Sequence, residues 1–117
     1  MAMESLSLKG LRALVTGAGT GIGKQIALGF AEAGADVVFV GRRLEPLEKV
    51  AALAKERYGT TSQCVAADVT VAEDCVRLGR EAGRIDILCN NAGASIYGKW
   101  QTISMEDWRQ VFAVNVE

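Results

Sequence analysis

Short apolar runs alternate along the chain with longer segments in which apolar residues recur at helical spacing. Short runs bounded by glycine are typical of buried strands, and spacing at i, i+3 and i+4 is typical of amphipathic helices. Their alternation predicts parallel strands joined by crossover helices. The continuous apolar run at residues 37–40 supports this, because a strand of a parallel sheet is covered on both faces.

The pattern predicts an α/β fold with four strands and four helices. The strands are expected at residues 12–15, 37–40, 64–67 and 85–89. Three helices are expected at residues 21–33, 46–58 and 71–82. A fourth helix is expected after Ser104, because Ser104 and Asp107 have the spacing of a capping box.

Composition then narrows the class of protein. The chain has 117 residues, the size of one domain, and a formal net charge of −1. This charge provides no general basic surface for nucleic acid. No apolar run approaches the length of a membrane helix, and the amino-terminal residues lack the pattern of a signal peptide. We therefore expect a cytoplasmic protein without a nucleic-acid or membrane partner.

The numbers and spacing of cysteine and histidine exclude several kinds of catalytic and metal site. The sequence contains no histidine, which excludes histidine-based nucleophile systems and histidine-bearing metal sites. The three cysteines, Cys64, Cys75 and Cys89, have the spacing of neither a disulfide framework nor a zinc site. We expect them to be reduced, small residues of the core, and we expect no metal site.

A glycine-rich segment lies between the first predicted strand and the first predicted helix. Residues 16–23 read Thr-Gly-Ala-Gly-Thr-Gly-Ile-Gly, with Gly17, Gly21 and Gly23 in the pattern G-x-x-x-G-x-G. Such a turn lets the backbone approach a pyrophosphate at the N-terminus of the helix. A P-loop does not fit, because no serine or threonine follows Lys24. The alternative is a glycine turn that serves packing alone.

The residues after the second predicted strand bear on the kind of dinucleotide. An acid at this point accepts hydrogen bonds from the ribose 2′-hydroxyl of NAD, whereas arginine accommodates the 2′-phosphate of NADP. The sequence here is Gly41-Arg42-Arg43. We therefore expect NADP, with NADPH favoured over NADH. The alternative is that both arginines are solvated loop charges.

Further motifs follow the glycine-rich segment along the chain. The chain also contains Asp68-Val69, the run Asn-Asn-Ala-Gly at residues 90–93, and Asn115. Together with the segment 16–23, these motifs resemble the short-chain dehydrogenase/reductase family across essentially the whole chain. The resemblance implies a Rossmann-type doubly wound parallel sheet, of which the chain holds the first four strands and helices. It also implies an oxidoreductase that transfers hydride between a nicotinamide and a carbonyl or alcohol carbon.

The resemblance also implies roles for particular residues. Asp68 would accept a hydrogen bond from the adenine amino group, while the Val69 backbone holds the ring. Asn91, Ala92 and Gly93 would line the pocket under the nicotinamide ribose. The plainer alternatives are that Asp68 only starts the turn into the next helix and that the asparagine and glycine form a tight turn.

The family's catalytic machinery is represented by one position, Asn115, which resembles the asparagine that keeps a proton-relay water. The alternative for Asn115 is an ordinary polar residue of a helix. The residues expected to bind the cofactor are Gly17, Gly19, Thr20, Gly21, Ile22, Gly23, Arg42, Arg43, Asp68, Val69, Asn91, Ala92 and Gly93.

One departure from the family limits what the chain does alone. Family members use a tyrosine as the general acid/base with a lysine four residues later, but Tyr58 is followed at that spacing by Ser62 and Tyr97 by Gln101. We therefore expect residues 1–117 to be the truncated amino-terminal, dinucleotide-binding portion of one domain. The parent would act on a small carbonyl or alcohol and, by resemblance, would be a homo-oligomer.

A different class of function stays open. The chain could be a stand-alone nucleotide-binding or structural module without catalysis, since it lacks the Tyr-x-x-x-Lys pair. A methyltransferase with an adenosyl cofactor is disfavoured, because that cofactor has no pyrophosphate and gives no use for Arg42 and Arg43.

Overall fold

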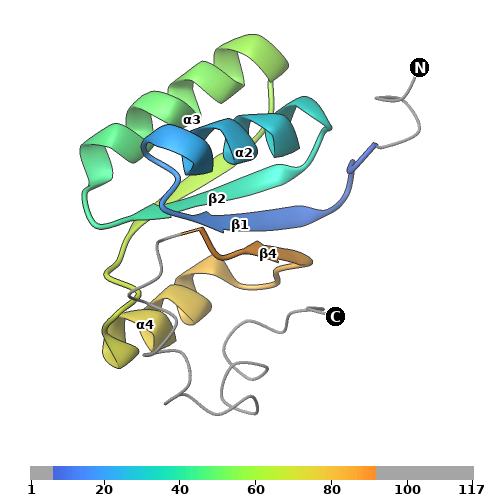
Figure 1. The fold of residues 1–117 in the computed structure, drawn as a ribbon. Coiled ribbons are helices and arrows are strands. Elements are labelled where there is room, and N and C mark those ends of the chain that lie inside the picture. The colour runs from blue at the N-terminus through green and yellow to red at the C-terminus, as the bar shows by residue number, and fades with distance from the viewer. Residues whose placement is uncertain (1–6, 92–117) are drawn as a thin grey trace.

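Four parallel strands form the middle layer of the protein in a computed structural model, which describes residues 7–91 (Figure 1). The strands are β1 (Arg12–Thr16), β2 (Asp36–Gly41), β3 (Ser62–Ala66) and β4 (Ile87–Cys89). The helices are α2 (Gly21–Glu32), α3 (Leu44–Tyr58) and α4 (Ala72–Ala82). The strand order is β3-β2-β1-β4, and every neighbouring pair is parallel.

Helices cover both faces of this sheet. Helices α2 and α3 lie on one face, and α4 lies on the other (Figure 1). Successive residues of β2 therefore enter different cores: Val38 and Val40 belong to the cluster on the α4 side, while Val37 and Phe39 belong to the cluster on the α2 and α3 side. All four side chains are fully buried, which explains why the run is apolar without alternation.

The sheet confirms the predicted α/β class and its Rossmann-like arrangement. From β1 the chain moves outward to β2 and β3, then returns to pair β4 with the opposite side of β1. In doubly wound sheets, ligands bind outside the carboxyl ends of the strands at the point where the order reverses. The fourth predicted helix, after Ser104, lies outside the described residues.

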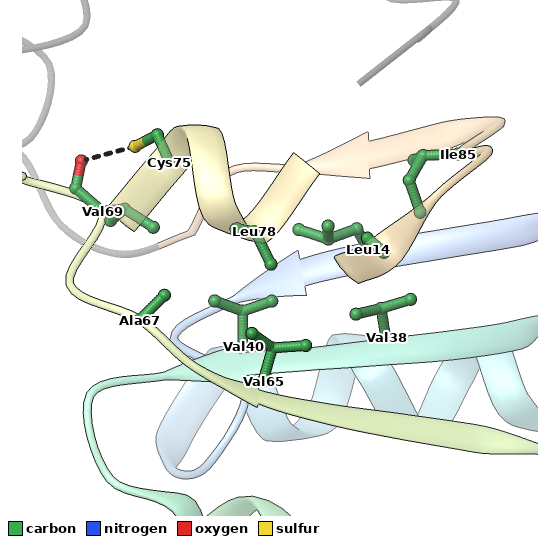
Figure 2. Close-up of a cluster of buried hydrophobic side chains, with 10 residues drawn as sticks. Leu14, Val38, Val40, Val65, Ala67, Val69, Cys75, Leu78 and Ile85 are labelled. Atoms are coloured by element: carbon green, nitrogen blue, oxygen red, sulfur yellow. Dashed lines mark hydrogen bonds between the residues drawn. The ribbon is translucent and has the colours of Figure 1, made fainter. Parts of the chain in front are cut away.

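Helix α4 is held to the sheet by a cluster of aliphatic side chains. Figure 2 shows Leu78 of α4 directed toward Leu14, Val40 and Val65 of three strands. At the other end of the cluster, the Cys75 thiol donates to the Val69 carbonyl oxygen, 3.4 Å away. The same packing that anchors α4 thus also fixes the segment that follows β3.

The element boundaries differ from the predictions by one or two residues. Helix α3 begins at Leu44 rather than at Pro46. The proline is accepted inside the first turn because the first N–H groups of a helix have no partner within the helix. Strand β3 begins at Ser62, which pairs with Val37, while β4 begins only at Ile87.

The expectation that all three cysteines are core residues is wrong in part. Cys75 is buried, but Cys64 and Cys89 are half-buried, and all three are free thiols. The difference follows from position, since Cys64 lies on β3 and Cys89 on β4, the two outer strands of the described sheet. Burial raises the pKa of all three thiols, most strongly that of Cys75.

Candidate functional site

The carboxyl ends of the four strands bring the predicted site segments to one edge of the sheet. The glycine-rich turn follows β1, the two arginines follow β2, Asp68 follows β3, and Asn91 follows β4. Backbone hydrogen bonds tie neighbouring segments together at this edge. The Ala18 N–H donates to the Val40 carbonyl oxygen (3.1 Å), and the Ala67 N–H donates to the Gly41 carbonyl oxygen (2.8 Å).

The three glycines of the motif serve different physical purposes. Gly17 and Gly21 have φ of 64° and 58°, a conformation that favours glycine. Gly23 has no such φ but is buried against the turn, where a Cβ atom would stand 2.0 Å from the Gly17 carbonyl oxygen and 2.5 Å from Asn91 Nδ2. Gly23 therefore permits α2 to approach the turn and Asn91, which is a packing role inside the protein.

The N-terminus of α2 is exposed to solvent. Thr20 is the N-cap residue, and its side chain makes no capping hydrogen bond to the helix. Thr20 and Gly21 are exposed, and the Ile22 side chain is 72% exposed although it is aliphatic. The first turn carries no acidic side chain. Such a helix end offers N–H donors and a positive dipole to an anion.

Thr16 is a buried residue of the site that the motifs alone did not predict. Its side chain is 1% exposed and lies at the end of β1. The Thr16 hydroxyl accepts a hydrogen bond from the Asn91 N–H (2.8 Å) and donates one to Asn90 Oδ1 (3.1 Å). Thr16 thus joins the glycine-rich turn to the segment after β4. A polar residue ending an apolar strand was the available signal.

The arginines after β2 lie on the surface beside the glycine-rich turn. Arg42 and Arg43 are exposed, and Arg43 is the N-cap residue of α3. Glu45, in the first turn of α3, pairs with Lys49 on its own helix at 3.4 Å. Gly41 is half-buried and places no side chain at the strand end. The strand is therefore followed by two exposed cations, and its last residue is a glycine rather than an acid.

Asp68 forms part of the turn that leads toward α4, and its contact with adenine stays a prediction. Asp68 Oδ1 accepts hydrogen bonds from the Thr70 N–H (2.9 Å) and the Thr70 hydroxyl (2.5 Å). The Asp68 N–H donates to Asp74 Oδ2 at 2.7 Å. Val69 is 7% exposed, and its side chain belongs to the core cluster on the α4 side of the sheet.

Three predicted site residues, Ala92, Gly93 and Asn115, lie outside the described residues. Within residues 7–91, no three side chains of the metal-binding types form a group that could hold an ion. The helices of that part are also too short or too polar to cross a membrane.

Comparisons with known proteins agree with this arrangement. The sequence model of a family described as short chain dehydrogenase matches residues 12–117. A tetrahydroxynaphthalene reductase of Pyricularia oryzae is 38% identical over 117 residues, which cover 96% of this chain and 41% of the reductase. The chain thus spans about two fifths of the length of this relative.

Solved structures give the same result. A hydroxysteroid dehydrogenase from Escherichia coli aligns with a TM-score of 0.73 and 37% identity over 78% of this chain and 40% of its own. An L-sorbose reductase from Gluconobacter frateurii, solved with NADPH and L-sorbose, aligns with a TM-score of 0.70 and 39% identity over 80% of this chain and 36% of its own. The chain belongs to the short-chain dehydrogenase/reductase family.

Proposed function

We propose that residues 1–117 are the dinucleotide-binding portion of an NADP(H)-dependent oxidoreductase that interconverts a carbonyl and a secondary alcohol. The observation that carries the proposal is that the exposed, acid-free N-terminus of α2 and the two exposed arginines after β2 lie at the same edge of the sheet. A pyrophosphate fits the first feature because it accepts hydrogen bonds from backbone N–H groups. A 2′-phosphate fits the second because guanidinium groups bind phosphate in two-point contacts.

The remaining predicted residues fit the rest of the same cofactor. Asp68 and the Val69 backbone would hold the adenine, and Asn91, Ala92 and Gly93 would line the nicotinamide ribose. The turn around the pyrophosphate would be formed by Gly17, Gly19, Thr20, Gly21, Ile22 and Gly23. Asn115 would keep a water for proton transfer. When bound, the cofactor supplies or accepts the hydride, and this portion of the protein orients it.

Two observations favour NADP over NAD. Gly41 stands where an acid would accept hydrogen bonds from a 2′-hydroxyl, and Arg42 follows it. The related L-sorbose reductase was solved with NADPH. NADPH is therefore the proposed cofactor and a small carbonyl compound the proposed substrate. Homo-oligomeric assembly and a cytoplasmic location stay predictions from the sequence.

The direct test is turnover by the protein in its full natural length. Ketones of different size are supplied with NADPH or NADH, and loss of the reduced cofactor is followed by absorbance. We expect oxidation that requires both a ketone and NADPH. Binding of NADPH with no turnover across the panel would favour the second candidate, a nucleotide-binding module without catalysis. The absence of a Tyr-x-x-x-Lys pair from the 117 residues is the observation behind that candidate.

A further inference from the structure

We infer that Leu47 is a specificity-determining residue, because its Cδ2 atom lies too close to the place that the Cβ atom of any side chain at position 41 would take. This inference rests on the proposed binding of a dinucleotide at the end of β2. Position 41 is where an acid would select NAD. Leu47, which belongs to the first turns of α3, would then help to decide the cofactor without touching it.

The backbone itself does not require glycine at position 41. Gly41 is the last residue of β2, and its φ is not among the positive values that favour glycine. The obstacle is a side chain. A Cβ atom built on Gly41 would stand 3.2 Å from Leu47 Cδ2 and 3.7 Å from Leu47 Cδ1 and Cγ. A contact of 3.2 Å between carbon atoms is closer than their optimal separation, so Leu47 would have to shift by a few tenths of an ångström.

Leu47 has little room to move. Its side chain is 1% exposed and packs in the core cluster on the α2 and α3 side of the sheet. Leu47 Cδ2 also lies 3.6 Å from the place where a Cβ atom of Gly19 would stand, and that place is 3.0 Å from Pro46 Cβ. The start of α3 therefore packs against both the end of β2 and the glycine-rich turn. Displacing Leu47 would press on the turn proposed to hold the pyrophosphate.

The preference for NADPH then has two separate sources. Arg42 supplies charge for the 2′-phosphate, and Leu47 disfavours an acid at position 41 that would accept the 2′-hydroxyl of NADH. The second source predicts that Gly41→Asp alone gives a poor NADH site. Shortening Leu47 to valine removes the Cδ atoms that oppose a side chain at position 41.

The contact is tested first by thermal unfolding, without cofactor. Gly41→Ala, Leu47→Val and the double variant are compared, with Gly29→Ala as a control because a Cβ there meets nothing within 4 Å. We expect Gly41→Ala to lower the unfolding midpoint in the wild-type background and to lower it clearly less in the Leu47→Val background. An equal effect of Gly41→Ala in both backgrounds would overturn the inference.

The consequence for specificity is tested by fluorescence titration with NADPH and NADH in the full-length protein. We expect Gly41→Asp to bind both cofactors weakly, and Gly41→Asp with Leu47→Val to bind NADH about tenfold more tightly than Gly41→Asp does. If the wild type prefers NADPH but Gly41→Asp alone binds NADH as tightly as the double variant does, the inference about Leu47 is overturned. The proposed function would still stand. A wild-type protein that binds neither cofactor would overturn the proposed function and the inference with it.

Discussion

The Thr16 hydroxyl accepts a hydrogen bond from the backbone N–H of Asn91 at 2.8 Å, across 75 residues of sequence. This bond links the end of β1, where the glycine-rich turn begins, to the segment that follows β4. It therefore fixes two halves of the candidate site relative to each other, at the place where the strand order reverses.

We expect Thr16→Val to lower the free energy of unfolding by about 1–3 kcal/mol, because valine keeps the volume but leaves the Asn91 N–H without its acceptor. NADPH binding should weaken in parallel. Thr16→Ser keeps the hydroxyl and is the matched control. Chemical denaturation measures the stability, and a serine variant as unstable as the valine variant would show that the hydroxyl is not what matters.

The two glycines at the start of α2 should respond differently to alanine. At Gly23 a Cβ atom would collide with the Gly17 carbonyl oxygen, so Gly23→Ala should cost about 3 kcal/mol or more of unfolding free energy. At Gly21 the space is open and only the φ of 58° opposes a side chain. Gly21→Ala should therefore cost about 1–2 kcal/mol.

The control for this pair is Gly29→Ala in the exposed part of α2, which should stabilise the protein by about 0.5–1 kcal/mol. Denaturant unfolding of the three variants gives the comparison. Equal losses at positions 21 and 23 would contradict the packing role assigned to Gly23.

The cysteines should differ in reactivity. Burial, with smaller contributions from the Asp74 and Asp68 carboxylates, raises the pKa of the Cys75 thiol to about 11. Because the thiolate is the nucleophile, Cys75 should be alkylated much more slowly than Cys64 or Cys89 in the folded protein at about pH 8. Mass spectrometry of the modified peptides measures the order, and fast labelling of Cys75 would contradict its burial.

The same shift has a consequence for stability. The pKa of Cys75 is higher in the folded protein than its ordinary value of 9.0, so the folded state holds the thiol proton more tightly than the unfolded state does. The resulting contribution to the free energy of unfolding is fully present below pH 9 and is lost as the pH rises toward 11. Cys75→Ala should accordingly show a smaller alkaline loss of stability than the wild type. An identical loss would assign the alkaline effect to other groups.

The sheet could be predicted from sequence because its information is local. The run Val37 to Val40 is apolar throughout, as a strand covered on both faces must be, and glycines follow the helices. The boundaries were less accurate because they depend on pairing partners. Strand β3, for example, begins where Ser62 meets Val37, and nothing near Ser62 in the sequence marks that point.

The site was predicted only as far as its motifs extend. The glycine turn and Arg42 can be found from residue type and spacing, but Thr16 acts through a residue 75 positions away. The contact between Gly41 and Leu47 could not be predicted from the sequence for the same reason, since it arises from the packing of α3 against β2. Residue type identified the chemistry, whereas tertiary packing determined which neighbours position it.

We propose that Arg42 gives this site a preference for NADPH over NADH. Fluorescence titration of the full-length wild type, Arg42→Ala and the control Arg57→Ala with NADPH and NADH tests it most directly. We expect Arg42→Ala to weaken NADPH binding by about 10- to 100-fold, because a charge-assisted contact to the 2′-phosphate contributes about 1.5–3 kcal/mol. NADH binding by that variant, and both affinities of Arg57→Ala, should stay nearly unchanged. An equal loss of NADPH and NADH affinity in Arg42→Ala would show that Arg42 does not distinguish the two cofactors.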